Sequence, residues 1–319
     1  MNPQSWFHPH QQLFLRYAAR IRLDPRSRGS TSKLIQTIYH VVLNRAAQPD
    51  EQARWATLLQ QGEIKWTGIV WQLLCSDELQ QLHPDWSLPR DPVQVQHALH
   101  HARCLLIRTE LPAADTIVDL GGACTESISG ALLWMGYAHP AREITIIDLP
   151  PARRMFAGTF KHMAAETINW IEAGQTRVRY IHTGMTDMSG VADASVDMLW
   201  LGQGIEHITQ AQARQVYSDA LRVLKPGGYF CLDTPNRALT RLQSPFGFIH
   251  PEHMHEYQPA ELAQQLTCAG LVVKRTLGIC PMPHSVRRQR FYPQEILDHT
   301  EVSPDAAISY FFYIECMKP

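Results

Sequence analysis

The chain has 319 residues, of which 45% are hydrophobic and 18% charged, a composition typical of a globular protein with a full core. Its formal net charge of -1 at pH 7 gives no support for a nucleic-acid partner or an anionic membrane surface. The seven cysteines are scattered without zinc-type spacing, and neither a leader pattern nor an apolar run of about 20 residues is found. We therefore expect a cytoplasmic protein with reduced thiols and no membrane span.

The N-terminal part of the chain has helical spacing. Residues 1–30 are polar and aromatic and end in a loop-like stretch, so they are interpreted as an N-terminal extension. Apolar residues then recur with helical period, with a break at Pro49, which predicts a small helical domain over residues 31–83. Three prolines within nine residues predict a linker over residues 84–91.

The remainder, residues 92–319, alternates between short apolar runs and helical patterns after an opening helix. Such alternation requires crossover connections and predicts a doubly wound α/β fold with a mostly parallel sheet of seven strands. The last two runs have no helix between them, so we expect the final strand to be antiparallel. The runs are Thr116–Leu120, Glu143–Asp148, Val178–His182, Val196–Leu201, Gly228–Asp233, Leu271–Leu277 and Ser309–Met317.

A glycine pair follows the first expected strand, and an acid ends the second. Gly121 and Gly122 let the backbone approach a ligand closely, and amides at the start of the next segment can donate hydrogen bonds. An acid at the position of Asp148 accepts hydrogen bonds from ribose hydroxyls in doubly wound nucleotide folds. A tight turn without a ligand, and a helix-capping role for Asp148, remain as alternatives.

Six motifs in order give the chain a specific resemblance over about residues 92–319. It resembles the class I S-adenosylmethionine (SAM)-dependent methyltransferases, and most closely the branch with ubiquinone-biosynthesis and sugar O-methyltransferases. The resemblance implies methyl transfer from SAM to an acceptor, expected to be a hydroxyl of a small molecule or glycan. The motifs are Val118–Gly122, Ile147-Asp148, Thr186-Asp187, Ile205–His207, Leu224–Gly228 and Thr234–Arg237.

The resemblance also implies which residues bind SAM. The methionine end would contact the glycine turn, and the ribose would contact the end of the second strand. The adenine would contact the turn after the third strand, and the sulfonium would lie beside the residues that end and follow the fourth strand. The implied cofactor-binding residues are Asp119, Gly121, Gly122, Ala123, Asp148, Leu149, Asp187, Met188, Leu201, Gly202 and Gln203.

The turn departs from the family pattern, because Ala123 and Thr125 stand where further glycines are usual. An alanine forced to positive φ would cost about 1 kcal/mol. A catalytically inactive methyltransferase-like binding or scaffold module is therefore the alternative function. A nicotinamide oxidoreductase is a weaker alternative, since it expects a third glycine where Cys124-Thr125-Glu126 stands.

Histidines are the candidate bases for removing a proton from a hydroxyl acceptor. His207 follows the fourth strand, and His253 and His255 alternate in the loop after the fifth, so that in an extended segment both would point to one side. These three are the predicted acceptor-side residues, with Asp233 as a lesser candidate. The His- and Glu-rich stretch 250–256 has metal-ligand chemistry, but no acid elsewhere is clearly placed to complete a site, so no metal is predicted.

The helical segment has its own resemblance. Tyr39–Glu51, Trp55 and Leu74–Leu79 are similar to a phycobilisome-linker-like helical domain that is often attached to bacterial surface-glycan enzymes. This implies a bacterial protein. A specific binding role, a lid, or homodimerisation or another protein contact through this domain all remain open.

Overall fold

The computed structural model describes residues 21, 24, 30–62, 64–74, 76–82, 92–154, 170–245, 247–250 and 252–319. The predicted linker 84–91 and nearly all of the predicted extension 1–30 lie outside these residues. The described residues form two compact units, a helical unit between residues 21 and 92 with residues 292–294, and an α/β unit from residues 93–291 and 295–319. None of the described helices has the length and apolar character that crossing a membrane requires.

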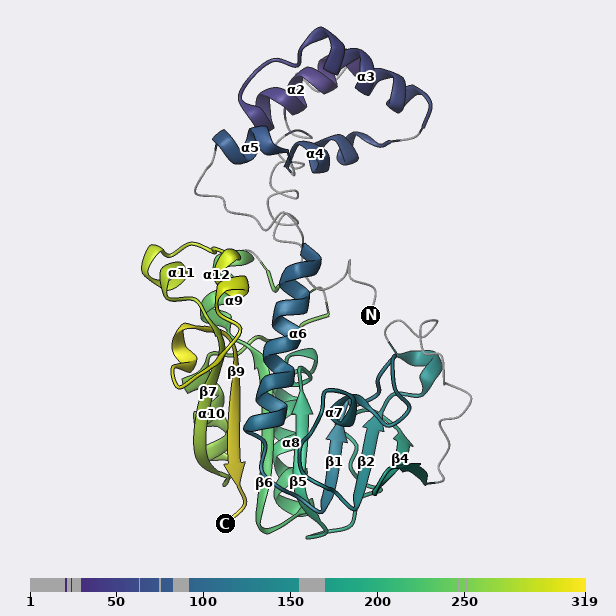
Figure 1. Ribbon diagram of the computed structural model, residues 1–319, viewed down its shortest axis with the longest axis vertical. Coiled ribbons are helices and arrows are strands. Elements are labelled where there is room, and N and C mark those ends of the chain that lie inside the picture. Colours follow the sequence, from purple (N-terminus) through teal and green to yellow (C-terminus); the bar gives the residue numbers. More distant parts are fainter. Residues whose placement is uncertain are drawn as a thin grey trace. The chain divides into compact units, whose positions relative to one another are not determined.

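The described residues of the helical unit include the four helices α2 to α5, with a hydrophobic core of their own (Figure 1). Ser30 caps the first by accepting a hydrogen bond from the amide of Lys33 at 3.3 Å, and Pro49 occupies the first position of the second, where its missing N–H is no loss. In the core, Trp55 Nε1 donates to the hydroxyl of Tyr39 at 2.8 Å. The helices are α2 (Thr31–Leu43), α3 (Pro49–Gln60), α4 (Trp66–Leu74) and α5 (Asp77–Leu82).

Arg45 forms ion pairs with residues of α3 and α5. Its guanidinium pairs with Glu51 at 2.7 Å and with Glu78, and it lies over the ring of Tyr39 at 5.0 Å from the centroid. Residues within the phycobilisome-linker-like motifs therefore have structural roles in this unit.

The α/β unit is built on one sheet with the strand order β3-β4-β2-β1-β5-β6-β9-β7-β8. The five strands from β4 to β6 are mutually parallel, whereas β9 is antiparallel to both of its neighbours, and its arrow points against that of β5 in Figure 1. The strands are β1 (Thr116–Leu120), β2 (Glu143–Asp148), β3 (Ile171–Ala173), β4 (Thr176–His182), β5 (Val196–Gly202), β6 (Leu224–Pro235), β7 (Val272–Pro281), β8 (Val302–Ser303) and β9 (Ser309–Met317).

The expectation of a mostly parallel sheet with an antiparallel last strand is confirmed, but the predicted number of seven strands is wrong. The described residues contain nine strands, because β3 and β8 extend the two edges. These strands have three and two residues, which is too short for an alternating apolar pattern to be recognised.

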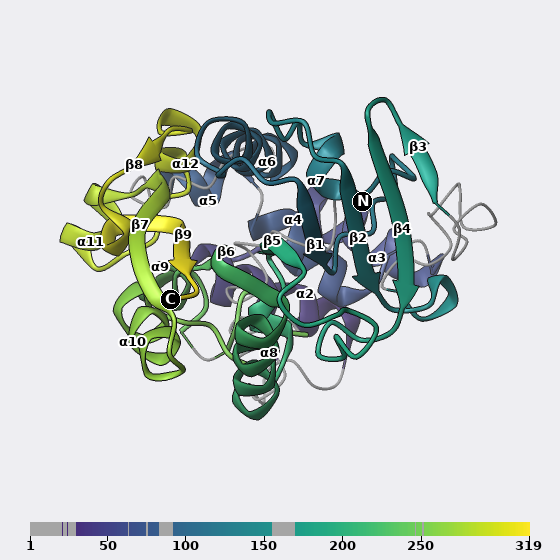
Figure 2. The same ribbon diagram turned by 90° about the horizontal axis from the view of Figure 1, so that it is seen from below.

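Helices cover both faces of the sheet, as Figure 2 shows with α6 and α7 on one side and α8 and α10 on the other. The main core lies between the sheet and the α8 side and includes Val118, Leu199 and Tyr217. The helices of this unit are α6 (Pro92–Thr109), α7 (Ala131–Trp134), α8 (Gln210–Val223), α9 (Arg237–Gln243), α10 (Pro259–Cys268), α11 (Pro283–Arg288) and α12 (Gln294–Asp298), and the short 3-10 helices are η2 (Pro151–Arg153), η5 (Ile205–His207) and η6 (Ala306–Ile308).

The strand order reverses between β1 and β5. From β1 the chain proceeds to β2 and β4 on one side, and from β5 to β6 on the other. In open α/β sheets, ligands bind outside the carboxyl ends of the strands at such a switch point. The loops after β1, β2 and β5 are therefore where a ligand is expected.

Candidate functional site

The two glycines after β1 are required for different reasons. Gly121 has φ of +72°, a left-handed conformation that other residues adopt only at a cost, and its amide donates to Ile147 O at 2.8 Å. Gly122 needs no unusual φ, but a Cβ there would overlap the carboxylate of Asp119. The turn therefore folds back closely over the end of its own strand.

Asp148 connects this turn to β2. Its Oδ2 accepts a hydrogen bond from the amide of Ala123 at 2.9 Å, and its Oδ1 accepts one from Leu149 at 2.7 Å. The guanidinium of Arg154 lies 3.7 Å from Oδ1. Ala123 is not in the left-handed region, so the backbone cost considered for this alanine does not arise.

Asp119 is an isolated acid beneath the turn, with an exposed fraction of 2%. Burial, with a further contribution from the negative charge of Asp148, raises its pKa to about 7. Its Oδ2 has no hydrogen-bond partner in the described part of the chain. A buried acid with an unsatisfied oxygen beside a ligand-type turn is the kind of group that a cationic ligand stabilises.

The loop after β5 is held by Asp233, at the end of β6. Gln203 has φ of +53°, and its amide and its Nε2 donate to Asp233 O and Oδ2, both at 2.9 Å. From α6, Arg103 forms two bonds to the same carboxylate, with Nε to Oδ2 at 2.6 Å and Nη2 to Oδ1 at 3.0 Å. Asp233 is fully buried and paired, so the structure gives it a positioning role rather than that of a base.

Other predicted cofactor residues lie around this edge in different settings. Asp187 is exposed, and hydrogen bonds from Ser189 and Thr183 lower its pKa. Met188 and Leu201 are buried in the core cluster, so their side chains belong to the core rather than to an open surface.

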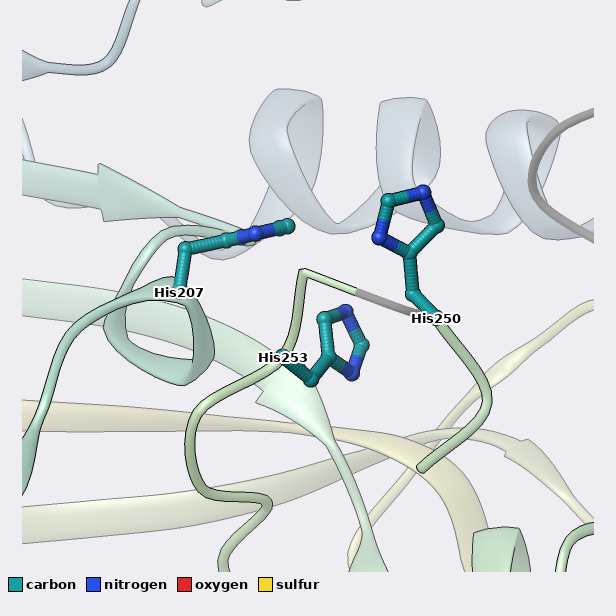
Figure 3. Close-up of side chains that lie close together, drawn as sticks. All are labelled: His207, His250 and His253. Carbon is teal, nitrogen blue, oxygen red and sulfur yellow. The ribbon is translucent and has the colours of Figure 1, made fainter. Parts of the chain in front are cut away.

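Three histidines come together beyond the ends of β5 and β6. His207 is in η5, and His250 and His253 are in the loop between α9 and α10. Their ring centroids are 4.8 Å (His207 to His253), 5.7 Å (His207 to His250) and 5.4 Å (His250 to His253) apart. Figure 3 shows the three rings gathered around a common space. We call them the histidine cluster.

Glu256 orients one ring of this cluster. His253 Nδ1 lies 2.7 Å from Glu256 Oε1, and Glu256 also accepts hydrogen bonds from Thr240 and from the amide of Ile249. Burial alone would raise the pKa of Glu256, but these bonds outweigh it and lower the pKa. The carboxylate therefore accepts a hydrogen bond from Nδ1–H of His253, and Nε2 is the ring nitrogen left for another partner.

Burial also keeps the other two rings uncharged. It lowers the pKa of His207 to about 3, aided by His253 and His250, and the pKa of His250 to about 4, aided by His253. Glu206, beside His207, is fully buried, which raises its pKa to about 7 while His253 acts in the opposite direction.

His255 lies in a different environment. The loop turns between His250 and His253, with a backbone hydrogen bond of 3.2 Å, instead of running extended. His255 Nε2 lies 2.8 Å from Glu261 Oε1 and 3.2 Å from Gln210 Nε2. His255 therefore has different partners from His253. The expectation that the two side chains point to the same side is not met.

Sequence reasoning missed three members of this site. Arg103 lies 130 positions before its partner Asp233, and nothing local marks an arginine in a helix as a partner of a buried acid. Glu256 and His250 lie in the His- and Glu-rich stretch 250–256. The sequence does not show which residue of this stretch contacts His253 and which joins the cluster, because that depends on how the loop turns.

Two comparisons of the sequence with known proteins found methyltransferases. Residues 122–232 match the family model of a methyltransferase domain. A protein of Mycolicibacterium smegmatis named "Probable S-adenosylmethionine-dependent methyltransferase" is 38% identical over 113 residues, which are 35% of this chain and 42% of the relative. The match thus covers less than half of that relative's length.

Among solved structures, a SAM-dependent methyltransferase from Thermotoga maritima is 15% identical, with a TM-score of 0.48 and coverage of 75% of this chain and 95% of the other. The geranyl diphosphate C-methyltransferase from Streptomyces coelicolor is 16% identical, with a TM-score of 0.46 and coverage of 72% and 85%. The two sequence matches are to a methyltransferase domain and to a probable SAM-dependent methyltransferase, so SAM is the cofactor that they support.

Proposed function

We propose that the α/β unit transfers a methyl group from SAM to a hydroxyl of a small molecule or glycan. The observation that carries the proposal is the contact between Asp148 Oδ2 and the amide of Ala123 at 2.9 Å, which joins the glycine turn to the acid after β2 at the switch point of the sheet. SAM supplies an electrophilic methyl group on its sulfonium. The protein must bind it, exclude water and align the acceptor.

On the donor side, the turn and its two acids have complementary tasks. Gly121 and Gly122 allow the methionine end to approach the backbone, with Ala123 beside them. Asp119 Oδ2 has no hydrogen-bond partner among the described residues. In this proposal it pairs with the positive charge at the methionine end of SAM.

Asp148 accepts hydrogen bonds from the ribose hydroxyls in this proposal. The other cofactor-binding residues that the resemblance implies would line the rest of the SAM site. The turn after β4 would contact the adenine, and the loop after β5 would lie beside the sulfonium. These residues are Leu149, Asp187, Gly202 and Gln203, together with the backbone of Met188 and Leu201, whose side chains lie in the core.

On the acceptor side, His253 is the best-oriented base. Glu256 holds its Nδ1 proton at 2.7 Å, so Nε2 can take up the proton that a hydroxyl loses when it attacks the methyl group. His207 lies against it, and His255 occupies a second position at the start of α10, beside Glu261.

The test replaces His207, His253 and His255 one at a time by glutamine and follows S-adenosylhomocysteine formation with a panel of hydroxylated acceptors. We expect His253→Gln to lower turnover by about 10²–10⁴-fold, with SAM affinity unchanged in calorimetry. His299→Gln, at a side chain 41% exposed that is not part of the cluster, is the matched control. Unchanged turnover in all three variants would remove the histidines from the reaction.

A further inference from the structure

The histidine cluster has the composition and spacing of a metal site. One nitrogen from each of His207, His250 and His253 lies within 4.8 Å of the other two, and the rings come from two chain segments that meet at this point (Figure 3). We propose that these three histidines bind a divalent transition-metal ion of the Zn²⁺ type.

The geometry requires only a small contraction. Zinc–nitrogen bonds of about 2.0–2.1 Å place two nitrogens on the same tetrahedral ion about 3.3 Å apart, compared with the upper limit of 4.8 Å found here. Rotation of the imidazoles about their side-chain bonds covers this difference. Three protein ligands and an open fourth position make up the familiar arrangement of a reactive zinc site.

His253 carries the strongest evidence for a ligand. Its side chain is 1% exposed, and its Nε2 has no hydrogen-bond partner anywhere in the described chain. A buried nitrogen lone pair left in this state costs about 1–3 kcal/mol. A carboxylate that holds the other ring nitrogen, as Glu256 does at 2.7 Å, is the usual outer partner of a metal-bound histidine.

Edge-to-face packing of the rings is the competing explanation. It accounts for the 4.8 Å centroid distance and the 89° angle between the rings of His207 and His253. It leaves the Nε2 lone pair of His253 unsatisfied, whereas a metal ion uses it.

Charge in the surroundings favours a cation. Glu256 bonds His253 directly, and Glu206 is fully buried beside it, with its Oε1 unpartnered among the described residues. Arg237 lies 3.3 Å from Oε2 of Glu256, whereas His253 contacts the other oxygen, Oε1. Two acids close to three imidazoles offset the charge of a buried dication.

The ligands of this chain are not equivalent. His250 Nδ1 accepts a hydrogen bond from the amide of Glu252 at 3.2 Å, and His207 bonds the backbone of the same residue, so each ring would bind the metal through its other nitrogen. For His250 this shifts the ring proton to Nδ1 and breaks the bond from Glu252. His250 is therefore expected to be the weakest ligand of the three.

The inference is separate from the base role proposed for His253, because an Nε2 that binds a metal ion has no lone pair left for a proton. Its test contains neither SAM nor an acceptor. The full chain, without a histidine tag and stripped by a chelator, is titrated with ZnCl₂ in a calorimeter and loaded with Co²⁺ for visible spectroscopy. We expect one ion per chain and the absorption of a tetrahedral cobalt site. His253→Ala should weaken binding by more than about 100-fold, and Glu256→Gln by about 10–100-fold.

His299→Ala, outside the cluster, should bind as the wild type does. Because His253→Ala can also disturb the loop, His207→Ala and His250→Ala are measured alongside, with thermal melting to confirm folding. Each should weaken binding, His250→Ala the least. Failure of the folded wild type to bind a stoichiometric ion, or equal affinity in all folded cluster variants, would overturn the proposal.

Discussion

At the scale of single residues, Gly122 is the position in the turn after β1 where a Cβ would clash. A Cβ there overlaps the carboxylate of Asp119, so Gly122→Ala must displace either the turn or the acid. We expect SAM affinity to fall by at least about tenfold, which corresponds to about 1.4 kcal/mol. Calorimetry with Gly247→Ala as the control checks this, because a Cβ at Gly247 meets only Ser244 at 3.9 Å. Equal affinity in both variants would contradict the expectation.

We expect Asp119 to make SAM binding depend on pH. Its pKa is raised to about 7 in the folded protein, so the folded state holds this proton more tightly than the unfolded chain. Its contribution to stability is complete below the unfolded pKa and is lost as the pH rises through about 7. A cation beside it favours the ionised form, so SAM affinity should rise about tenfold from about pH 6 to about pH 8.

Calorimetric titrations across this range, with Asp119→Asn for comparison, measure the effect. The asparagine variant should bind more weakly at high pH, and its affinity should vary little with pH. An affinity for SAM that is flat in the wild type, or that falls as the pH rises, would show that Asp119 does not face the cation.

Residue types with a local signature could be predicted from the sequence. Gly121, Gly122 and Asp148 directly follow or end buried strands, so their place at one edge of the sheet follows from parallel topology. The partners Arg103 and Glu256 could not be predicted, because their roles depend on contacts made only after the chain has folded.

At the scale of elements, the ion pair of Arg103 and Asp233 joins α6 to the ends of β5 and β6. Asp233 is fully buried, so Arg103→Met leaves a buried carboxylate without its countercharge. We expect a loss of about 3–5 kcal/mol in the free energy of unfolding, measured by urea denaturation. Arg142→Met, at a side chain 56% exposed, should change it by less than about 0.5 kcal/mol. Similar losses in both variants would contradict this reading.

The elements themselves were mostly evident in the sequence. The seven long strands, with the antiparallel β9 among them, could be predicted because each has at least five residues with several apolar side chains. The edge strands β3 and β8 are held by backbone pairing with β4 and β7, which leaves no periodic apolar signal.

At the scale of the whole molecule, the two units have separate hydrophobic cores. Trp55 is 4% exposed and is bonded to Tyr39 in the helical unit. Trp55→Ala should therefore destabilise that unit by about 3–5 kcal/mol while the α/β unit keeps its affinity for SAM. Thermal unfolding and SAM titration of the same variant test both parts. Loss of SAM affinity would mean that the cores are coupled.

The division into a helical and an α/β segment is predicted from the three prolines between residues 84 and 92, and from the alternation of strands and helices farther along the chain. The acceptor could not, because its recognition depends on the packing of side chains from several loops rather than on a local pattern.

The central claim is that SAM binds where the glycine turn meets Asp148, and isothermal titration of the full chain with SAM tests it most directly. We expect one saturable site in the wild type, binding weakened by at least about tenfold in Asp148→Ala, and wild-type affinity in Asp193→Ala, an acid 74% exposed. No binding to the folded wild type, or equal affinity in Asp148→Ala, would contradict the account.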